Sequence, residues 1–282
     1  MQSMKGLIQL IAAYNQVRYA KDNGITMIVT DHHDVPFEIK DDKKVYIVPP
    51  ADAVINPKQA DCDYPFKLLC GAGVAYKLIS LLYDRLGLDK KELEDYIEFM
   101  AIATVGDIVD LIDENRIVVK YGLKHIAHTK NTGLRALIEE CQLDINNISS
   151  YHIGFVIGPC LNASGRLDTA RQAIELMLCK DNENMAKELI ALNNERKSMT
   201  EQETQKAIEL VENTGLLKDR VLVIYLKDCH ESIAGIIAGR IKERYYRPTF
   251  VITNAEDGAK GSGRSIEGYN MYEEINKCKN VL

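Results

Sequence analysis

Short apolar runs, each followed by a polar turn, mark the first part of the sequence. Ile25–Thr30 is apolar and rich in β-branched residues, and it follows the turn at Gly24, which predicts a buried strand. Leu7–Ile11 and Ala53–Ile55 predict two further strands, and Tyr14–Lys21 predicts a helix between the first two. Strands that alternate with helices usually pair in parallel, so this pattern predicts an α/β domain built on a parallel sheet.

A long helix is predicted in the second half. No Gly or Pro occurs between Gly165 and Gly215, so residues 184–213 can form one continuous helix. The middle of this helix, Asn193–Ser198, is polar on every side, which is typical of a helix that bridges two domains through solvent. We therefore predict a first domain over residues 1–183, a connecting helix over 184–214 and a smaller α/β domain over 215–282.

The smaller domain opens with Val221–Tyr225, a continuous apolar run of the kind found in parallel sheets. A helix over residues 233–245 and a strand over 248–252 are predicted next. The glycine-rich segment Lys260–Ser265 then predicts a loop whose backbone can approach a ligand closely. Ser262, Gly263 and Arg264 of this loop would bind phosphate, and a plain flexible loop is the alternative.

The composition narrows the class of protein. Of 282 residues, 46% are hydrophobic and 27% are charged, which is typical of a soluble globular protein. No apolar run is long enough to cross a bilayer and no signal peptide is evident, so we expect a cytoplasmic protein without a membrane partner. The seven cysteines form no Cys-x-x-Cys pair, which argues against a disulfide framework or a structural zinc site. With a net charge of −6, any phosphate binding has to come from a local group of basic residues.

The candidate chemistry begins at Asp31, His32 and His33, directly after the predicted strand Ile25–Thr30. Ligand sites of open α/β sheets lie at the carboxyl ends of the strands. A carboxylate with two imidazoles suits Mn²⁺, Fe²⁺ or Zn²⁺ and suits Mg²⁺ less well. Three consecutive candidate ligands favour a metal site over the alternative of a polar turn.

Two other segments present polar side chains next to glycine. Asp107 follows Gly106 at the end of an apolar segment, as a second acid for the metal site or as a helix N-cap. Between Gly158 and Gly165, glycine and proline predict a loop that presents Asn162 and Arg166. Arg grips phosphate oxygens with a planar fork, and a surface ion pair of Arg166 with Asp168 is the alternative.

Four motifs in this order resemble those of the DHH phosphoesterases, and within that family the RecJ-like single-strand-specific exonucleases. The motifs are Asp31-His32-His33, Gly106-Asp107-Ile108-Val109, Gly158-Pro159-x-x-Asn162-Ala163-x-Gly165-Arg166 and Gly261-Ser262-Gly263-Arg264-Ser265.

The resemblance implies an α/β DHH domain with two Mn²⁺ or Mg²⁺ ions, a connecting helix, and a DHH-associated domain that closes over single-stranded DNA. It also implies 5′ to 3′ phosphodiester hydrolysis assisted by the two ions. By motif position, the metal ligands are Asp31, His32, His33 and Asp107, of which His32, His33 and Asp107 are catalytic. DNA phosphate would be held by Asn162, Arg166, His230, Ser262, Gly263 and Arg264.

The sequence also departs from the family. RecJ-like proteins carry an Asp-x-Asp motif and a further acid before the Asp-His-His triplet, whereas Asp22 is the one acidic residue before Asp31 here. The glycine- and histidine-rich motif expected after the last helix is absent too. We therefore expect an internal section of a RecJ-type protein that is inactive on its own. A separately encoded N-terminal fragment is a candidate partner, and the oligomeric state is left open.

Two other functions stay open. A DHH phosphoesterase of short oligonucleotides or cyclic dinucleotides would keep the fold and change the substrate, although such relatives use a Gly-Gly-His loop that this chain lacks. A non-catalytic module could bind single strands through Arg166, Ser262 and Arg264, and its binding would then survive removal of metal and weaken with salt.

Overall fold

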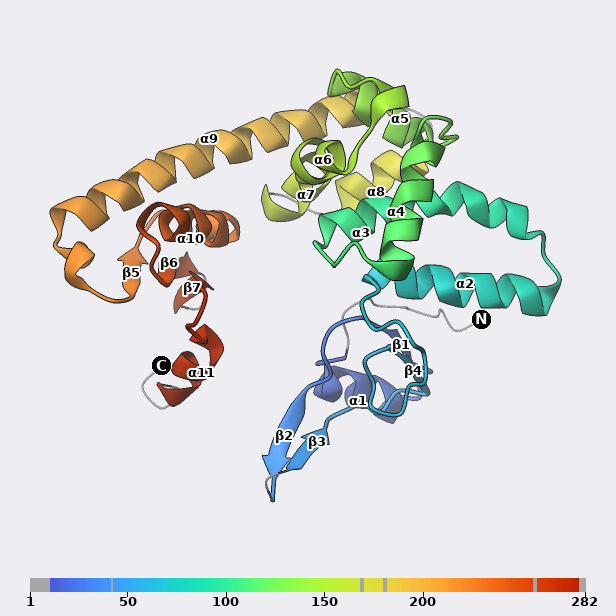
Figure 1. Cartoon of the computed structure of the whole chain (residues 1–282), viewed down its shortest axis with the longest axis horizontal. Helices are drawn as coiled ribbons and strands as arrows, with labels where there is room; N and C mark the ends of the chain where they lie inside the picture. The colour runs from blue at the N-terminus through green and yellow to red at the C-terminus, as the bar shows by residue number, and fades with distance from the viewer. Residues whose placement is uncertain (1–10, 42, 168–169, 180–181, 256–257, 279–282) are drawn as a thin grey trace. The chain divides into compact units, whose positions relative to one another are not determined.

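The computed structural model of the chain describes residues 11–41, 43–167, 170–179, 182–255 and 258–278 (Figure 1). The chain divides into two compact units, residues 1–158 and 159–282. Among the described residues, no helix is both long and apolar enough to cross a membrane. The strand predicted at Leu7–Ile11 lies outside the described residues except for Ile11.

The sheet of the first unit confirms the strand–helix pattern. Strand β1 (Ile28–Thr30) pairs in parallel with β4 (Ala53–Ile55), with Val29 opposite Val54. Helix α1 (Tyr14–Asp22) buries Val17 against Val29 and its neighbours. The predicted α/β class is confirmed.

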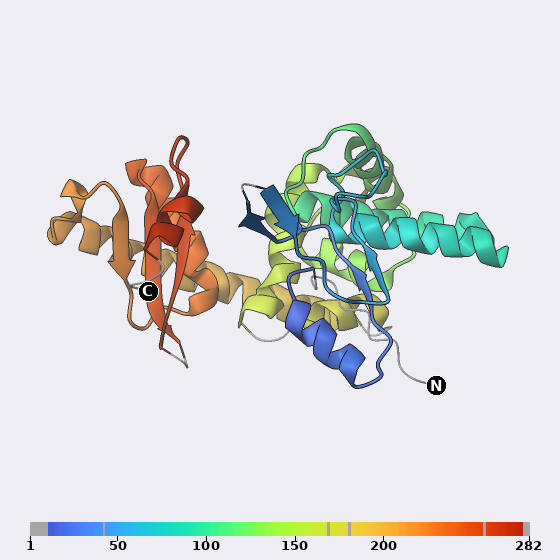
Figure 2. The same ribbon diagram turned by 90° about the horizontal axis from the view of Figure 1, so that it is seen from below.

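An antiparallel hairpin follows the Asp-His-His triplet, where the sequence predicted no regular element. Strands β2 (Phe37–Lys40) and β3 (Lys43–Tyr46) pair with Phe37 opposite Tyr46, and every described residue of both strands is exposed. Both views show the hairpin extending away from β1 and β4 (Figures 1 and 2). Phe37–Lys40 does alternate between apolar and polar residues, but the alternation is only four residues long and does not continue through Lys43–Tyr46, and neither face of the hairpin is buried.

Helices complete the first unit. Helices α3 and α4 cross closely at Gly122, where a Cβ atom would lie 2.3 Å from Cβ of Ala101. Helix α3 is almost wholly apolar, as its burial requires. The helices are α2 (Gly71–Leu86), α3 (Ile97–Gly106), α4 (Asp113–Ile126), α5 (Thr132–Glu140) and α6 (Ser150–His152), with 3-10 helices at Lys90–Tyr96 and Ile145–Asn147 and a π-helical turn at Ile153–Ile157.

The second unit is a three-stranded sheet covered by helices. Its strand order is β5 (Leu222–Tyr225), β6 (Thr249–Ala255) and β7 (Gly258–Arg264), parallel between the first two and antiparallel between the last two. Buried isoleucines of α10 pack on β5 and on Ala207 and Val211 of α9. The helices are α7 (Gly158–Leu167), α8 (Arg171–Leu178), α9 (Glu183–Asn213), α10 (Glu231–Tyr245) and α11 (Met271–Lys277), with a 3-10 helix at Leu216–Lys218.

Two predicted loops are regular elements instead. The segment Gly158–Gly165 lies in α7, which continues directly from the π-helical turn Ile153–Ile157, so the missing N–H group of Pro159 falls where the regular α-helical hydrogen bonding is already interrupted. The segment Lys260–Ser265 lies mostly in β7, because Gly263 lets the strand close on β6. A Cβ atom at Gly263 would lie 2.7 Å from the Phe250 ring.

The long helix is confirmed as α9, and within its polar stretch Asn193–Ser198 four of the six residues are exposed, as expected of a solvated bridge. Asn193, Thr200 and Thr204 in its central part are buried. The units divide between Gly158 and Pro159, so α9 belongs to the second unit as the contacts define it. The domain limits at residues 183 and 214 stay a prediction.

Candidate functional site

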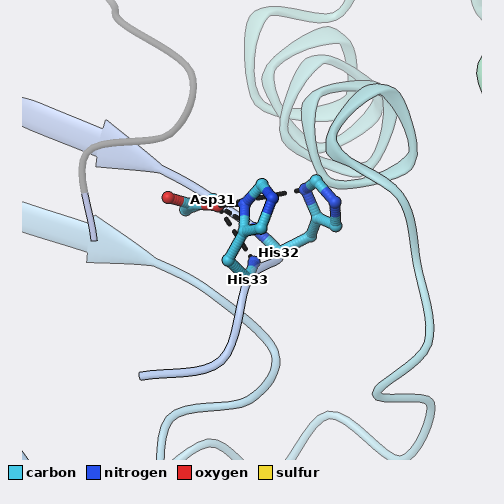
Figure 3. A group of neighbouring side chains, drawn as sticks. All are labelled: Asp31, His32 and His33. Carbon is cyan, nitrogen blue, oxygen red and sulfur yellow. Dashed lines mark hydrogen bonds and ion pairs between the residues drawn. The ribbon is translucent and has the colours of Figure 1, made fainter. Parts of the chain in front are cut away.

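Asp31 fixes the turn that follows β1 (Figure 3). Its backbone N–H group donates to the carbonyl of Ile55 at 3.0 Å, which extends the ladder to β4. The backbone N–H groups of Ile11, His32 and His33 donate to its buried carboxylate at 2.9, 2.6 and 3.0 Å, and Nδ1 of His33 lies 2.7 Å from Oδ1. Three of these contacts share Oδ1 and only that from Ile11 falls on Oδ2, so Oδ2 keeps a free lone pair. Asp31 therefore holds the turn and orients His33.

The charge of Asp31 is stabilised by the same contacts. Burial alone would raise the pKa of this carboxyl group. The hydrogen bonds from His33, Ile11 and His32 outweigh burial and hold the pKa below its ordinary value. The turn therefore keeps a negative charge beside two imidazoles at neutral pH, which favours a cation at this place.

His32 connects this turn to the end of α3. Its Nε2 atom lies 2.8 Å from Oδ2 of Asp107, which is the C-cap residue of α3. The alternative of Asp107 as a helix N-cap is therefore wrong. Nδ1 of His32 is buried and has no hydrogen-bond partner among the described residues, at 3.9 Å from Oδ1 of Asp31. A buried polar atom without a partner is costly, so this nitrogen is available to a ligand.

The donors of this group fit a divalent cation. The ligand atoms of Asp31, His32 and His33 lie within 4.8 Å of one another, and the two imidazole rings are 4.2 Å apart. Nitrogen and carboxylate oxygen donors together suit Mn²⁺, Fe²⁺ or Zn²⁺. Oδ1 of Asp31 is occupied by hydrogen bonds, so Oδ2 of Asp31 and the side chains of His32, His33 and the half-exposed Asp107 are the donors available to an ion. They fit one ion and are too few for two.

In the second unit, Arg166 lies in the last turn of α7. Its Nη1 atom donates to the carbonyl of Ser232 in the first turn of α10 at 2.6 Å. Asn162 is exposed one turn earlier, on the same side of α7. The alternative ion pair with Asp168 falls outside the described residues.

Ser262 and Arg264 reach the same helix from β7. A Cβ atom at Gly235 would lie 3.0 Å from Nη2 of Arg264 and 3.3 Å from Oγ of Ser262. Gly235 thus gives both side chains room against α10. Gly263 lies between them, and its lack of a side chain is required by packing against Phe250, as described above. Nothing in the sequence pattern had singled out Ser232 or Gly235.

His230 is the N-cap of α10. Its ring accepts from the backbone N–H group of Ser232, and Nδ1 lies 2.7 Å from the Ser232 hydroxyl. His230, Lys227 and Lys260 line a surface pocket of about 840 Å³, where Nζ of Lys260 lies 2.9 Å from a carboxylate oxygen of Glu231. The structure therefore brings Arg166, His230, Ser262 and Arg264 to the first turns of one helix.

Two family models match parts of this chain. The family model described as DHH family, N-terminal domain, matches residues 9–104, and the DHHA1 domain model matches residues 218–281. The chain therefore carries a DHH family N-terminal domain followed by a DHHA1 domain. The first match contains the Asp31 turn, and the second contains β5, α10 and β7.

Several members of the DHH family resemble the chain over nearly its whole length. The single-stranded-DNA-specific exonuclease RecJ of Bacillus subtilis is 37% identical over 96% of this chain and 33% of its own length. RecJ of Escherichia coli is 35% identical over 95% of this chain and 48% of its own length. The structure of RecJ with Mn²⁺ from Thermus thermophilus matches with a TM-score of 0.80 at 29% identity, over 96% of this chain and 39% of that one. The chain thus spans a third to a half of the curated relatives named here.

Proposed function

We propose that this chain is part of a metal-dependent, single-strand-specific exodeoxyribonuclease that works from the 5′ end of DNA. The observation that carries the proposal is the contact between His32 and Asp107 beside the buried carboxylate of Asp31. The similarity to relatives described as single-stranded-DNA-specific exonucleases, and to RecJ structures with Mn²⁺ or Mg²⁺, supports it.

The proposed roles follow from the contacts. His32, His33 and Asp107 hold Mn²⁺ or Mg²⁺, and Asp31 acts as the group that positions His33 and the turn. A bound ion of this kind activates water and stabilises the leaving oxygen in phosphodiester hydrolysis. The DNA backbone is held in the second unit by the side chains or backbone of Asn162, Arg166, His230, Ser262, Gly263 and Arg264.

The ligand set for two ions is incomplete within these 282 residues. Asp22 is the one acidic residue before Asp31, and it lies at the end of α1, ahead of β1. Two divalent ions need several carboxylates to compensate their charge. We propose that further acids come from polypeptide outside these residues, in the same or in another chain, and that the 282 residues alone do not hydrolyse DNA.

The test supplies the missing acids. The segment of Bacillus subtilis RecJ that precedes its matched region is fused ahead of Ile11, and release of nucleotides from a 5′-phosphorylated, 3′-labelled single strand is measured with Mn²⁺. We expect activity from the fusion and none from the 282 residues alone. His32→Ala should lower the activity about a hundredfold, and the exposed control His128→Ala should leave it unchanged. A folded fusion without activity, or activity that tolerates His32→Ala, would contradict the proposal.

The incomplete acid set also favours a second candidate, a module that binds single strands without cleaving them. Binding would then depend on the second unit and persist in a chelator. Under this candidate the fusion stays inactive although it binds single strands with and without Mn²⁺, whereas the nuclease proposal requires cleavage.

A further inference from the structure

The hairpin of β2 and β3 carries apolar and aromatic side chains that are exposed to solvent. Cross-strand partners share a face of the hairpin, so the register places Phe37, Ile39, Lys44 and Tyr46 on one face, called here the aromatic face. The exposed fractions of Phe37, Ile39 and Tyr46 are 46%, 60% and 45%. Neighbouring exposed side chains of this kind form a patch, and burial within the unit does not explain why they occur together.

The two faces of the hairpin differ in charge. The opposite face is more polar, with Glu38, Lys40, Lys43 and Val45. There Nζ of Lys40 lies 3.0 Å from a carboxylate oxygen of Glu38, so part of its charge is compensated within the hairpin. Among the described residues of the two strands, the aromatic face holds one cation, Lys44, and no acid. This face is therefore complementary to an anion.

The two rings of the aromatic face are arranged edge to face. The centroids of Phe37 and Tyr46 lie 6.1 Å apart, with 67° between the ring planes, and Nζ of Lys44 lies 4.4 Å from the centroid of Phe37. Rings in this arrangement do not cover each other as parallel stacked rings do. A flat π-system such as a nucleobase can stack on them, and the cation beside them can bind a phosphate of the same strand.

The size of the aromatic face limits what can bind there. At about 3.3 Å per residue and about 4.8 Å between strands, one face of two four-residue strands covers on the order of 130 Å². A stable protein interface buries about 800 Å² of each partner. The face is therefore too small to be the main contact of a second copy or of another protein, whereas one or two unpaired bases need no larger surface.

The hairpin is attached to the candidate metal site through its base. The backbone N–H group of Ile47 donates to the carbonyl of Pro36 at 2.7 Å, which closes the hairpin where it leaves the Asp31 turn. The carbonyl of His33 accepts from Nδ2 of Asn56 at 2.9 Å, which fixes the turn at its other side. Since β2 begins four residues after His33, its first residue lies within about 14 Å of that histidine. A short single strand can therefore contact both places.

We propose that the aromatic face of the hairpin binds unpaired bases of single-stranded DNA, by stacking on Phe37 and Tyr46, while Lys44 binds a phosphate of the backbone. This inference rests on the proposed function and adds to it a contact in the first unit that no motif of the sequence indicated. Every base has a π-face, so the contact is independent of base sequence. Bases of a duplex are already stacked on each other, so the contact selects single strands.

A tryptophan on the hairpin tests the inference directly, because the 282 residues contain no tryptophan. The Tyr46→Trp chain is titrated with oligothymidylate in EDTA, which prevents cleavage, and its emission is recorded. We expect a loss of emission as the strand binds, because a stacked base quenches indole. The Tyr121→Trp chain is the control: Tyr121 is 63% exposed on α4, away from the hairpin in sequence, and its emission should not change.

Two further nucleic acids separate bases from phosphates. A strand of the same length made of abasic sites has the phosphates without the bases, and a duplex of the same length has paired bases. Neither should quench Tyr46→Trp. Quenching by the abasic strand equal to that by oligothymidylate would reduce the hairpin to a phosphate contact and overturn the stacking.

Substitutions on the two faces separate stacking from charge, with affinity measured by anisotropy in EDTA. Phe37→Ala should weaken binding of oligothymidylate about tenfold, and Phe37→Leu should do nearly the same, because it keeps apolar bulk without a ring. Lys44→Gln should weaken binding about threefold. Lys43→Gln is the matched control, since Lys43 precedes Lys44 in β3 and lies on the opposite face, and it should leave affinity almost unchanged. Circular dichroism and thermal unfolding establish that each variant is folded.

Unchanged emission of Tyr46→Trp while the strand binds would overturn the inference, and so would full affinity in the Phe37→Ala chain or no binding by the folded wild-type chain. Emission that changes with protein concentration in the absence of DNA would place a second copy on this face instead. These outcomes are separate from the fate of the proposed function. An inactive fusion protein whose hairpin still stacks on the strand would reject the nuclease and retain the contact, and an active fusion whose affinity tolerates Phe37→Ala would do the reverse.

Discussion

At the scale of single residues, the type of a side chain predicted that it belongs to a site but did not predict what it contacts there. The triplet from Asp31 to His33 was recognisable as a site because three candidate ligands follow a strand. The separate role of each of the three residues could not be predicted. Which oxygens of Asp31 are already occupied depends on the backbone of Ile11, twenty positions away. The contact of His32 with Asp107 likewise depends on how α3 ends. The ligand roles therefore stay proposals, and the following substitutions separate a ligand from a positioning group.

Asp31→Asn should destabilise the chain by about 1–3 kcal/mol, because the amide nitrogen replaces one carboxylate oxygen and cannot accept the N–H groups bonded there, that of Ile11 or those of His32 and His33. Denaturant unfolding measures the difference. Asp34→Asn is the control, since the side chain of Asp34 is 92% exposed, and it should cost less than about 1 kcal/mol. A stable Asp31→Asn chain that loses Mn²⁺ binding would instead make Asp31 a direct ligand.

Cys229 should be chemically inert although it borders the pocket at His230. Burial raises the pKa of its thiol to about 11, so at pH 8 the reactive thiolate is a very small fraction. Alkylation followed by mass spectrometry should modify the exposed Cys179 and Cys278 more than about a hundredfold faster. Because the pKa is raised, the rate at Cys229 should keep climbing as pH increases toward 11. Rapid modification at neutral pH would show that the pocket opens to solvent.

At the scale of elements, the spacing of apolar residues predicted those helices and strands that have a buried face. The strand at β1, the strand at β5 and the long helix α9 were all predictable, because an apolar period or an unbroken helical run marks each of them. The glycines were ambiguous signals for prediction, because glycine occurs both in turns and where two elements pack closely. Segments α7 and β7 were therefore mistaken for loops, and the hairpin of β2 and β3 was missed because no face of it is buried.

Gly122→Ala tests glycine as a packing residue. The added Cβ atom would lie 2.3 Å from Cβ of Ala101 and 2.8 Å from the carbonyl of Ile97, so α3 and α4 have to separate. We expect a loss of about 1–3 kcal/mol in unfolding free energy. Gly106→Ala is the control in α3: no atom lies within 4 Å of its added methyl, so it should be neutral or gain up to about 1 kcal/mol. Equal stability of the two variants would contradict the close crossing.

At the scale of the whole molecule, the order of the motifs indicated the family, whereas groups of residues that meet only after folding could not be predicted. The side chain of Asn193 donates to Sγ of Cys160, 33 residues away, and no local pattern connects them. The net charge of −6 likewise did not indicate that arginines gather around α10. A polar stretch that looks solvated is ambiguous for the same reason, because a buried network and a wet surface use the same residue types.

Binding of single-stranded DNA should therefore depend strongly on salt in spite of the acidic chain. With about three phosphates contacted, the slope of log affinity against log salt should be about −2, so a fourfold rise in salt weakens binding about fifteenfold. Anisotropy titrations over a salt series measure the slope, and Arg166→Gln should reduce its magnitude by about 0.7. A slope near zero would exclude the arginines as phosphate ligands.

The hairpin of β2 and β3 offers a practical handle on the first unit. Its first strand begins four positions after His33, and both strands are exposed throughout the described residues, so the tip contributes nothing to a core. Exposed tips of this kind accept inserted sequence with little loss of stability. A fluorescent label or a small reporter domain grafted between the two strands would lie at the far end of a hairpin that leads away from β1, and would therefore mark this unit without blocking the Asp31 turn.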